Sequence, residues 1–301
     1  MKILVLFVFD PLVIMPARPF FSIIIPTRNE AKRLAYCLPS LLGQDFESFE
    51  IIIVDDPETS DETVKFVEGL RDKRLHYLRH KAGLRVPAKR NLGAREARGQ
   101  YLYFIDADME FPAGVLSSLA AQLKAEKISV LFVAERTPGA EWVARMKDLE
   151  KQIIQREVTL IAARLYRRTL FKKLGGYKEN LVVNEEVELS DRALTQGYPY
   201  GFSQVSVNHY ETSGQSLLPH LRKKFKYGTT AADYFAQTEE TEEMAEKRAG
   251  TSRLVYFTSP RTWQNPLLGL QFVTFKTLEI GSMILGLLYA KIKPTRTVTT
   301  K

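Results

Sequence analysis

Apolar and polar residues alternate along the first 210 positions with two different periods. Three short β-rich runs each end in polar residues, and the chain between them carries apolar residues at helical spacing. The runs are Phe21–Ile25, Glu50–Val54 and Tyr101–Ile105, and the helical stripes are Leu34, Leu38, Leu41 and Leu42, then Val64, Val67 and Leu70. This alternation predicts an α/β fold with a mainly parallel, Rossmann-like sheet flanked by helices. Ligands of such sheets bind at the carboxyl ends of the strands.

The pattern changes from about residue 217. Residues Leu221–Gly228 predict a basic helix with interleaved aromatic residues, and the acidic run Glu239–Glu246 follows. A solvated helix face is the usual explanation for such charges. Beside an apolar segment, basic and aromatic residues together also indicate contact with a membrane surface.

Residues 267–290 form a mostly apolar segment in which Lys276 and Glu279 are the only charges. A helix of this length can cross a hydrocarbon core, and the two charges fall on one helix face, where they can pair. A charged pair in mid-bilayer is costly, so the pattern favours a helix in the interface or packed against a partner. A buried helix of a soluble protein is the alternative. Basic residues flank the segment: Arg253, Arg261, Lys291, Lys293 and Arg296.

The first fifteen residues are apolar but are interrupted by Asp10-Pro11, and the run Ile3–Phe9 is too short to span a bilayer. The segment resembles the start of a signal peptide without a cleavage site. We expect a buried or interfacial lead-in to the first strand, with initiation at Met15 as an alternative.

Composition narrows the chemistry. Hydrophobic residues make up 45% and charged residues 26% of the chain, which excludes wholesale disorder. The formal charge of +8 suggests an anionic partner, whether nucleic acid, lipid or phosphorylated substrate. The single Cys37 excludes an internal disulfide and a cysteine zinc cage, and four histidines disfavour a multi-histidine site. Carboxylates must therefore carry the chemistry.

Acidic or polar residues follow three of the predicted strands. The strand ends are Ile25-Pro26-Thr27-Arg28-Asn29-Glu30, Val54-Asp55-Asp56 and Ile105-Asp106-Ala107-Asp108-Met109-Glu110. Each alone is ordinary turn chemistry. Together, at one edge of a parallel sheet, they indicate a binding site.

These strand ends resemble those of glycosyltransferase family 2. The later family elements, a Gly-Gly-Tyr turn and a Glu-Asp-x-Asp-Leu helix start, are matched by Gly175-Gly176-Tyr177 and by Glu185–Leu189. The resemblance covers residues 20–210 and implies a GT-A fold and transfer of a sugar from a nucleotide donor with a divalent metal. We expect a lead-in (1–19), a GT-A catalytic domain (20–212), interface helices with a polar linker (213–262) and a membrane-associated helix with a basic tail (263–301).

The resemblance implies a Mn²⁺ or Mg²⁺ ion on Asp106 and Asp108, which would neutralise the charge of a leaving diphosphate. Glu110 continues the alternation and is a third candidate ligand. His209 follows the strand-like run Gly201–Asn208, where related enzymes have a histidine near the metal. A purely structural role is the alternative for His209.

The nucleotide-sugar site implied by the resemblance uses the same strand ends. Asp56 accepts a hydrogen bond from the base and Asp55 shapes the loop. Arg90, from the stretch Gly83–Asn91, is expected to bind phosphate, because a guanidinium group can donate two parallel hydrogen bonds to phosphate oxygens. Lys89 shares that role or lies on a solvated helix face. The other expected donor-site residues are Pro26, Thr27, Arg28, Asn29, Glu30, Asp106 and Ala107.

The catalytic base of the family falls on Glu186, where glutamate replaces the usual aspartate. Glu185 is the alternative, and because helix neighbours point about 100° apart, only one of the two is expected to face the donor. Glu188 and Arg192 are assigned to the acceptor side, with a Glu188–Arg192 ion pair as the structural alternative.

The expected function is an inverting, metal-dependent hexosyl transfer to a lipid-linked acceptor, with the catalytic domain on the cytoplasmic side. The Asp106–Glu110 turn resembles that of polyprenol-phosphate mannosyltransferases of glycan assembly, such as those using dolichol, and suggests GDP-mannose. A UDP-sugar-dependent enzyme of polysaccharide synthesis is the alternative. The C-terminal layout also resembles a shortened cellulose-synthase-like enzyme, with too few spans for a processive polymerase.

Other classes fit less well. A nucleotidyltransferase needs a glycine-rich, lysine-containing loop after the first strand, and none appears here. A dinucleotide dehydrogenase needs Gly-x-Gly-x-x-Gly after a strand, and that motif is also missing. A basic membrane or nucleic-acid binding module is suggested by Arg222–Lys226 with Phe225 and Tyr227. That module leaves the acidic strand ends unexplained, so no nucleic-acid partner is expected. The sequence leaves oligomerisation open.

Overall fold

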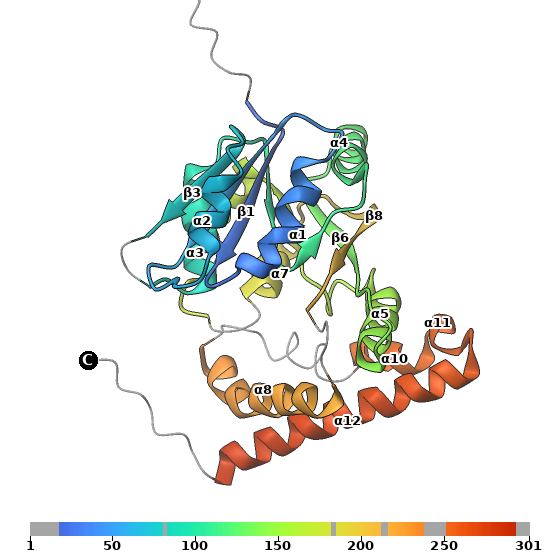
Figure 1. Cartoon of the computed structure of the whole chain (residues 1–301). Helices are drawn as coiled ribbons and strands as arrows, with labels where there is room; N and C mark the ends of the chain where they lie inside the picture. The colour runs from blue at the N-terminus through green and yellow to red at the C-terminus, as the bar shows by residue number, and fades with distance from the viewer. Residues whose placement is uncertain (1–17, 81–82, 182–184, 212–215, 238–250, 293–301) are drawn as a thin grey trace, which may run out of the picture.

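The computed structural model describes residues 18–80, 83–181, 185–211, 216–237 and 251–292. The expectations for residues 1–15 and for the acidic run at 239–246 lie outside the described residues. The described chain forms one eight-stranded sheet, in the order β3-β2-β1-β4-β7-β6-β8-β5, with helices on both faces (Figure 1). The strands are β1 (Phe21–Thr27), β2 (Phe49–Asp55), β3 (Leu75–Arg79), β4 (Tyr101–Phe104), β5 (Met109–Glu110), β6 (Val130–Arg136), β7 (Leu165–Arg167) and β8 (Tyr200–His209).

The first half of the sheet is parallel, as expected. β1 pairs in parallel with β2 on one side and β4 on the other, and β3 extends the set beyond β2. β1 is buried on both faces, because Phe21, Ile23 and Ile25 enter one core and Ile24 enters the other. Such two-sided burial is typical of parallel strands covered by helices.

The second half of the sheet is mixed, although β6 still pairs in parallel with β8. β7 runs antiparallel to both β4 and β6, and β5 runs antiparallel to β8. The pairing of β5 with β8 sets Met109 opposite His209. This pairing brings His209 to the acidic turn that follows β4.

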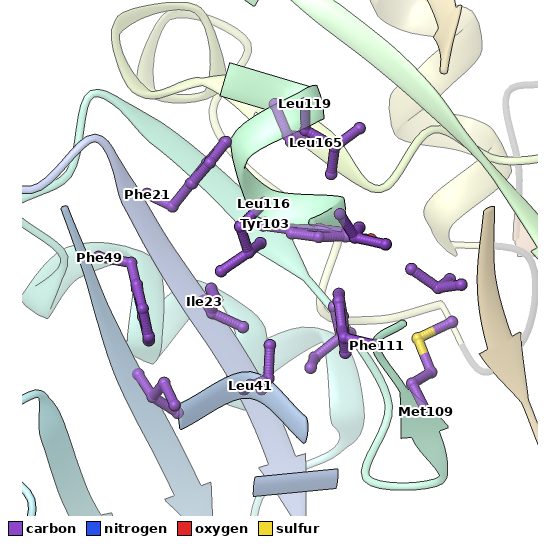
Figure 2. Packing of buried hydrophobic residues seen from close by; sticks show 14 of the residues in the cluster. Phe21, Ile23, Leu41, Phe49, Tyr103, Met109, Phe111, Leu116, Leu119 and Leu165 are labelled. Atoms are coloured by element: carbon purple, nitrogen blue, oxygen red, sulfur yellow. The ribbon is translucent and has the colours of Figure 1, made fainter. Parts of the chain in front are cut away.

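Two helical layers cover the sheet. The first layer contains α1 (Ala31–Leu42), α2 (Thr63–Gly69) and α4 (Val115–Glu126), and the second contains α3 (Val86–Glu96), α6 (Arg168–Lys173) and α7 (Glu185–Thr195). In the first core, Phe21 and Ile23 of β1 pack with Leu41 of α1 and Leu116 of α4 (Figure 2). Burial of apolar area of this kind, at about 25 cal/mol per Å², is the main stabilising contribution.

A third layer lies below the carboxyl edge of the sheet and is built from α5 and the C-terminal helices (Figure 1). Its elements are α5 (Trp142–Ile154), α8 (Leu217–Gln237), a 3₁₀ turn (Thr251–Leu254), α10 (Val255–Thr258), α11 (Pro260–Trp263) and α12 (Pro266–Ile292). Among the described residues, α12 is the one helix long and apolar enough to cross a membrane by length and composition.

The charges of α12 face the protein. Lys276 and Glu279 form the expected ion pair, and both side chains are buried. Lys276 Nζ lies 2.8 Å from Glu150 Oε1 of α5, and Glu279 Oε1 lies 2.6 Å from His220 Nε2 of α8. The opposite face exposes apolar side chains: Leu267, Leu270, Leu278, Ile284, Leu285, Leu288, Tyr289 and Ile292. The helix therefore docks on the domain through its buried charges and through Phe272 and Phe275, which pack against α5, and leaves a hydrophobic face outward.

The crossing of α8 and α12 depends on two glycines. A Cβ on Gly286 would stand 2.1 Å from the Phe225 carbonyl oxygen, and one on Gly228 would stand 2.1 Å from the Met283 carbonyl oxygen. Without Cβ atoms at these positions the two helix backbones come into direct contact.

We expect Gly286→Ala to destabilise the folded chain by about 1–3 kcal/mol, because the added methyl overlaps the α8 backbone. Gly281→Ala on the same helix is the matched control, since nothing lies within 4 Å of its added Cβ. Alanine there stabilises the helix by up to about 1 kcal/mol. Thermal unfolding of both variants in one detergent measures the difference, and equal melting temperatures would contradict the close crossing.

Candidate active site

The loop after β2 is braced by Asp55. Its carboxylate accepts hydrogen bonds from Thr27 Oγ1 and Thr59 Oγ1, each at 2.8 Å, and from the Tyr77 hydroxyl at 2.5 Å. Three donors from three segments hold one buried carboxylate. Asp55 therefore holds the loop in shape through these contacts.

Asp56 and Lys89 form a buried pair beside Thr27. Lys89 Nζ lies 2.9 Å from Asp56 Oδ2 and donates to the Thr27 carbonyl oxygen at 2.9 Å. Burial alone raises the pKa of a carboxyl group, but hydrogen bonds from Lys89 and the Glu58 amide outweigh it and lower the pKa of Asp56. The solvated helix face considered for Lys89 is wrong, because this side chain is buried.

The remaining residues of the first motif are spread over the loop surface. Asn29 adopts a positive φ of 56°, and its Oδ1 accepts from the amide of Ser60 at 2.8 Å. Arg28 pairs with Glu58 and Glu30 pairs with Arg33. Pro26 is half-buried beside them, and Ala107 is buried in the third strand-end motif.

Asp106, Asp108 and His209 converge at the end of β4. One ligand atom from each lies within 4.8 Å of the others, an arrangement that can hold a metal ion. His209 Nε2 stands 3.2 Å from Asp108 Oδ1 and 3.9 Å from Asp106 Oδ2. Two carboxylates and one imidazole are a donor set that suits Mn²⁺ or Mg²⁺. The residues present therefore fit a divalent metal.

Glu110, the third candidate ligand, lies outside this cluster. Its Oε2 accepts from Asn208 Nδ2 at 3.1 Å and from the Tyr210 hydroxyl at 2.7 Å. Glu110 is the register partner of Asn208 in the β5–β8 pair, so the two side chains lie on the same face of the sheet and meet there.

Glu135 holds the other side of the His209 ring and was missed at the sequence level. Its Oε2 lies 2.7 Å from His209 Nδ1, and its Oε1 lies 2.5 Å from Arg164 Nε. Burial by itself lowers the pKa of an imidazole, but the Glu135 charge and hydrogen bonds to Asp108 and Glu135 raise the pKa of His209 to about 10. The Glu135 contact orients the ring so that Nε2 faces Asp108. Glu135 ends an apolar run from Val130, the same strand-end pattern that marks the other acids.

We expect Glu135→Gln to weaken Mn²⁺ binding by about 10- to 100-fold, because the amide loses the charge that holds the His209 ring. Titration of Mn²⁺ followed by electron paramagnetic resonance measures this affinity without turnover. Glu141→Gln, an exposed change nearby, is the control. An unchanged Mn²⁺ affinity in a folded Glu135→Gln protein would remove the orienting role.

Two arginines join the metal candidates to the glutamate pair on α7. Arg90 is buried and contacts Asp106 at 2.9 Å, Glu185 at 2.9 Å and Glu186 at 2.7 Å. Arg164, also missed at the sequence level, contacts Asp106 at 3.2 Å and Glu186 at 3.3 Å. Both glutamates therefore face the same guanidinium, although neighbouring residues of a helix point about 100° apart. They do so because Arg90 lies between their side chains at the start of the helix.

The electrostatics of this cluster differ between its acids. Burial opposes ionisation of Asp106, but the charges of Arg164 and Arg90 lower its pKa well below the usual range. Burial and the neighbouring Glu186 raise the pKa of Glu185, against the effect of Arg90. Asp106 is thus held in its ionised form, whereas Glu185 has an increased proton affinity.

Glu188 and Arg192, assigned to the acceptor side, form the ion pair considered as the structural alternative. The two side chains approach to 2.7 Å, and Arg192 also donates to the Leu174 and Gly176 carbonyl oxygens. These contacts tie α7 to the end of α6.

The fold and site define an α/β protein with a candidate metal centre at the carboxyl edge of its parallel strands. Residues 22–178 match the family described as "Glycosyl transferase family 2", which is more than half of the 301 residues. The chain belongs to this family.

Relatives in sequence share part of their length with the chain. The poly(ribitol-phosphate) beta-N-acetylglucosaminyltransferase TarS of Staphylococcus aureus (strain MW2) is 32% identical over 167 residues, or 50% of this chain and 28% of TarS. The GalNAc(5)-diNAcBac-PP-undecaprenol beta-1,3-glucosyltransferase of Campylobacter jejuni is 36% identical over 104 residues, or 34% of this chain and 33% of that enzyme. The chain thus matches about a third or less of these two relatives.

Similarity in structure extends over nearly the whole chain. The mannosyltransferase PcManGT from Pyrobaculum calidifontis, solved with GDP-Man and Mn²⁺, has a TM-score of 0.66, covers 93% of this chain and 89% of its own, and is 14% identical. S. aureus TarS 1-349 with UDP-GlcNAc has a TM-score of 0.56, 20% identity and coverages of 89% and 81%. These similarities establish the GT-A-like fold.

Proposed function

We propose that the chain is an inverting, metal-dependent glycosyltransferase that moves a hexose from a nucleotide sugar to a lipid-linked acceptor. The observation that carries this proposal is the convergence of Asp106, Asp108 and His209 beside the glutamate pair of α7. A metal site and a proton acceptor are the two groups that inverting sugar transfer needs.

Asp106, Asp108 and His209 would hold the metal, which would neutralise the charge that develops on the leaving diphosphate. Glu186 takes the proton of the acceptor hydroxyl as that oxygen attacks the anomeric carbon. The bond from this carbon to the diphosphate breaks on the opposite side, which inverts the configuration. Arg90 and Arg164 hold Glu186 in place through contacts with its Oε1.

The donor we place first is GDP-mannose, on the resemblance of the Asp106–Glu110 turn to polyprenol-phosphate mannosyltransferases. A UDP-sugar is the second candidate. It is favoured by TarS, whose name describes an N-acetylglucosaminyltransferase and which was solved with UDP-GlcNAc.

The acceptor proposal rests on α12 and on the Campylobacter relative, whose name describes an undecaprenol-linked acceptor. The outward face of α12 is apolar, and basic side chains such as Arg222, Lys223 and Lys226 of α8 lie exposed beside it. Such a surface suits a helix lying in the membrane interface. Because sugar nucleotides are made in the cytoplasm, the catalytic domain is placed on that side.

Thermal-shift titration with GDP, UDP and their sugar conjugates, with and without Mn²⁺, tests the donor site. A nucleotide at 100 times its Kd stabilises the fold by about 2.7 kcal/mol. Metal-dependent stabilisation by one nucleotide identifies the base. A folded protein that no nucleotide stabilises would contradict the proposed function.

A further inference from the structure

A cavity of about 750 Å³ lies between the ends of β6 and β8 and the helices α5, α11 and α12. Its lining includes three arginines, Arg136, Arg145 and Arg261, and a single carboxylate, Asp148. The lining carries no other charged side chain, so the cavity has a surplus of positive charge.

The single carboxylate is already engaged. Asp148 binds Arg136 through both oxygens at 2.7 Å and also accepts from the Thr137 amide at 2.9 Å. Arg145 is exposed and has no ion-pair partner in the described part of the chain. Arg261 has no carboxylate partner there either, and it donates to the Gln155 amide oxygen at 3.0 and 3.1 Å. The Arg145 guanidinium is therefore available to an anion, and Arg261 adds a second positive charge that no carboxylate of the described residues neutralises.

A hydroxyl group in the lining also lacks a partner. Thr137 is 2% exposed, and its Oγ1 forms no hydrogen bond within the described residues. A buried hydroxyl without a partner costs roughly 1–3 kcal/mol, a cost that an acceptor oxygen reaching Oγ1 would remove. Phosphate oxygens accept from hydroxyl and guanidinium donors alike.

Apolar side chains flank the polar lining along the chain. Gln264 and Asn265 line the cavity, while Trp263 before them and Leu267 after them are 46% and 68% exposed. A ligand at this site meets cations and amides inside and an exposed apolar helix outside. A phosphate ester of a long-chain lipid matches both chemistries.

The cavity adjoins the candidate metal centre through two strands. Arg136 follows Glu135 on β6, and Asn208 precedes His209 on β8. On each strand, a residue that lines the cavity is therefore adjacent to one at the metal centre. Because neighbouring strand residues point to opposite faces, the cavity and the centre lie on opposite sides of these strands.

We propose that this cavity binds the phosphate group of a lipid, with the diphosphate of the lipid-linked acceptor as its first source. This assignment of the source rests on the proposed function. An anionic phospholipid headgroup offers the same chemistry and is the second source. Held here, the phosphate anchors the acceptor beside α12 while its sugar extends past the strand ends.

Binding of farnesyl diphosphate in detergent, measured by calorimetry without Mn²⁺ or nucleotide, tests the site directly. We expect the wild type to bind this probe and to ignore farnesol, which lacks the phosphates. Arg145→Gln and Arg261→Gln should each raise the Kd by about 10-fold through loss of a charge-assisted hydrogen bond. Asp108→Ala should leave it unchanged, which separates this site from the donor site.

The control is Arg95→Gln/Lys73→Gln, which removes two exposed cations elsewhere. Thr137→Val adds an independent measure. Loss of the hydroxyl should weaken binding of farnesyl diphosphate, while the melting temperature of the protein without ligand stays equal or rises. Equal weakening by the control, or no change in any cavity variant, would overturn the proposal.

Sedimentation with phosphatidylcholine vesicles, with and without phosphatidylglycerol, separates the two sources. Variants that lose only the phosphatidylglycerol-dependent binding support the phosphate site and assign it to a headgroup. Variants that lose only the binding of farnesyl diphosphate assign the phosphate site to the lipid-linked acceptor. Neither arm uses turnover, so failure of the proposed function appears separately, as a lack of nucleotide-dependent stabilisation in the wild type.

Discussion

Replacing Asp108 with alanine is expected to abolish the Mn²⁺-dependent stabilisation by nucleotide sugar and to lower kcat/KM by about 1,000-fold. Asp108 is a candidate ligand of the cation that would neutralise the charge developing on the diphosphate, and loss of one such stabilising interaction has an effect of this size, about 4 kcal/mol. Asp108 is 8% exposed, and its Oδ1 lies 3.2 Å from His209 Nε2. Removing it leaves Asp106 and His209 without the third member of the cluster.

The matched control for this change is Asp45→Ala, which removes an exposed carboxylate from the turn after α1. Calorimetry with Mn²⁺ and steady-state kinetics are run on both variants, with circular dichroism to confirm folding. Retained metal dependence in Asp108→Ala would place the cation elsewhere.

The strand-end acids were predictable because a parallel sheet brings successive carboxyl ends to one edge. Asp55 and Asp56 end the β-branched run that forms β2, and Asp106 follows the aromatic-rich run that forms β4; both strands pair with β1. The same logic applied to the run ending at Glu135 would have found the partner of His209.

Other parts of the site depend on tertiary contacts that no local pattern encodes. Arg164 precedes a three-residue strand whose antiparallel pairing had no sequence signature. Lys89 lies on a helix with a polar sequence, so its burial against Asp56 could not be read from periodicity. The C-terminal helix α12 shows the same limit, because its apolar length was evident from the sequence while its buried contacts with Glu150 and His220 come from distant segments.

The two glutamates at the start of α7, Glu185 and Glu186, are the candidates for the catalytic base. Both carboxylates contact Arg90, so direction alone does not distinguish them. Glu186 is held by two guanidinium groups, from Arg90 and Arg164, and both contacts are made to Oε1. Its Oε2 accepts no hydrogen bond in the described part of the chain, which leaves that oxygen to receive a proton.

We therefore expect Glu186→Gln to lower kcat by about 100- to 10,000-fold while donor affinity changes little. The amide oxygen can still accept from Arg90 and Arg164, so the cluster keeps its geometry, but an amide cannot take the proton of the acceptor hydroxyl. Single-turnover kinetics with saturating donor measure the chemical step, and the thermal shift with nucleotide measures donor binding.

Glu185→Gln is the matched comparison, since it lies one residue away and binds the same arginine. If Glu186 is the base, Glu185→Gln keeps most of the rate. The raised pKa of Glu185 then results from burial and from the Glu186 charge, and the reaction does not need this carboxylate. The reverse result, full loss in Glu185→Gln with activity retained in Glu186→Gln, would transfer the base to Glu185. The two arginine contacts to Glu186 would then serve only to hold α7 against the acidic turn.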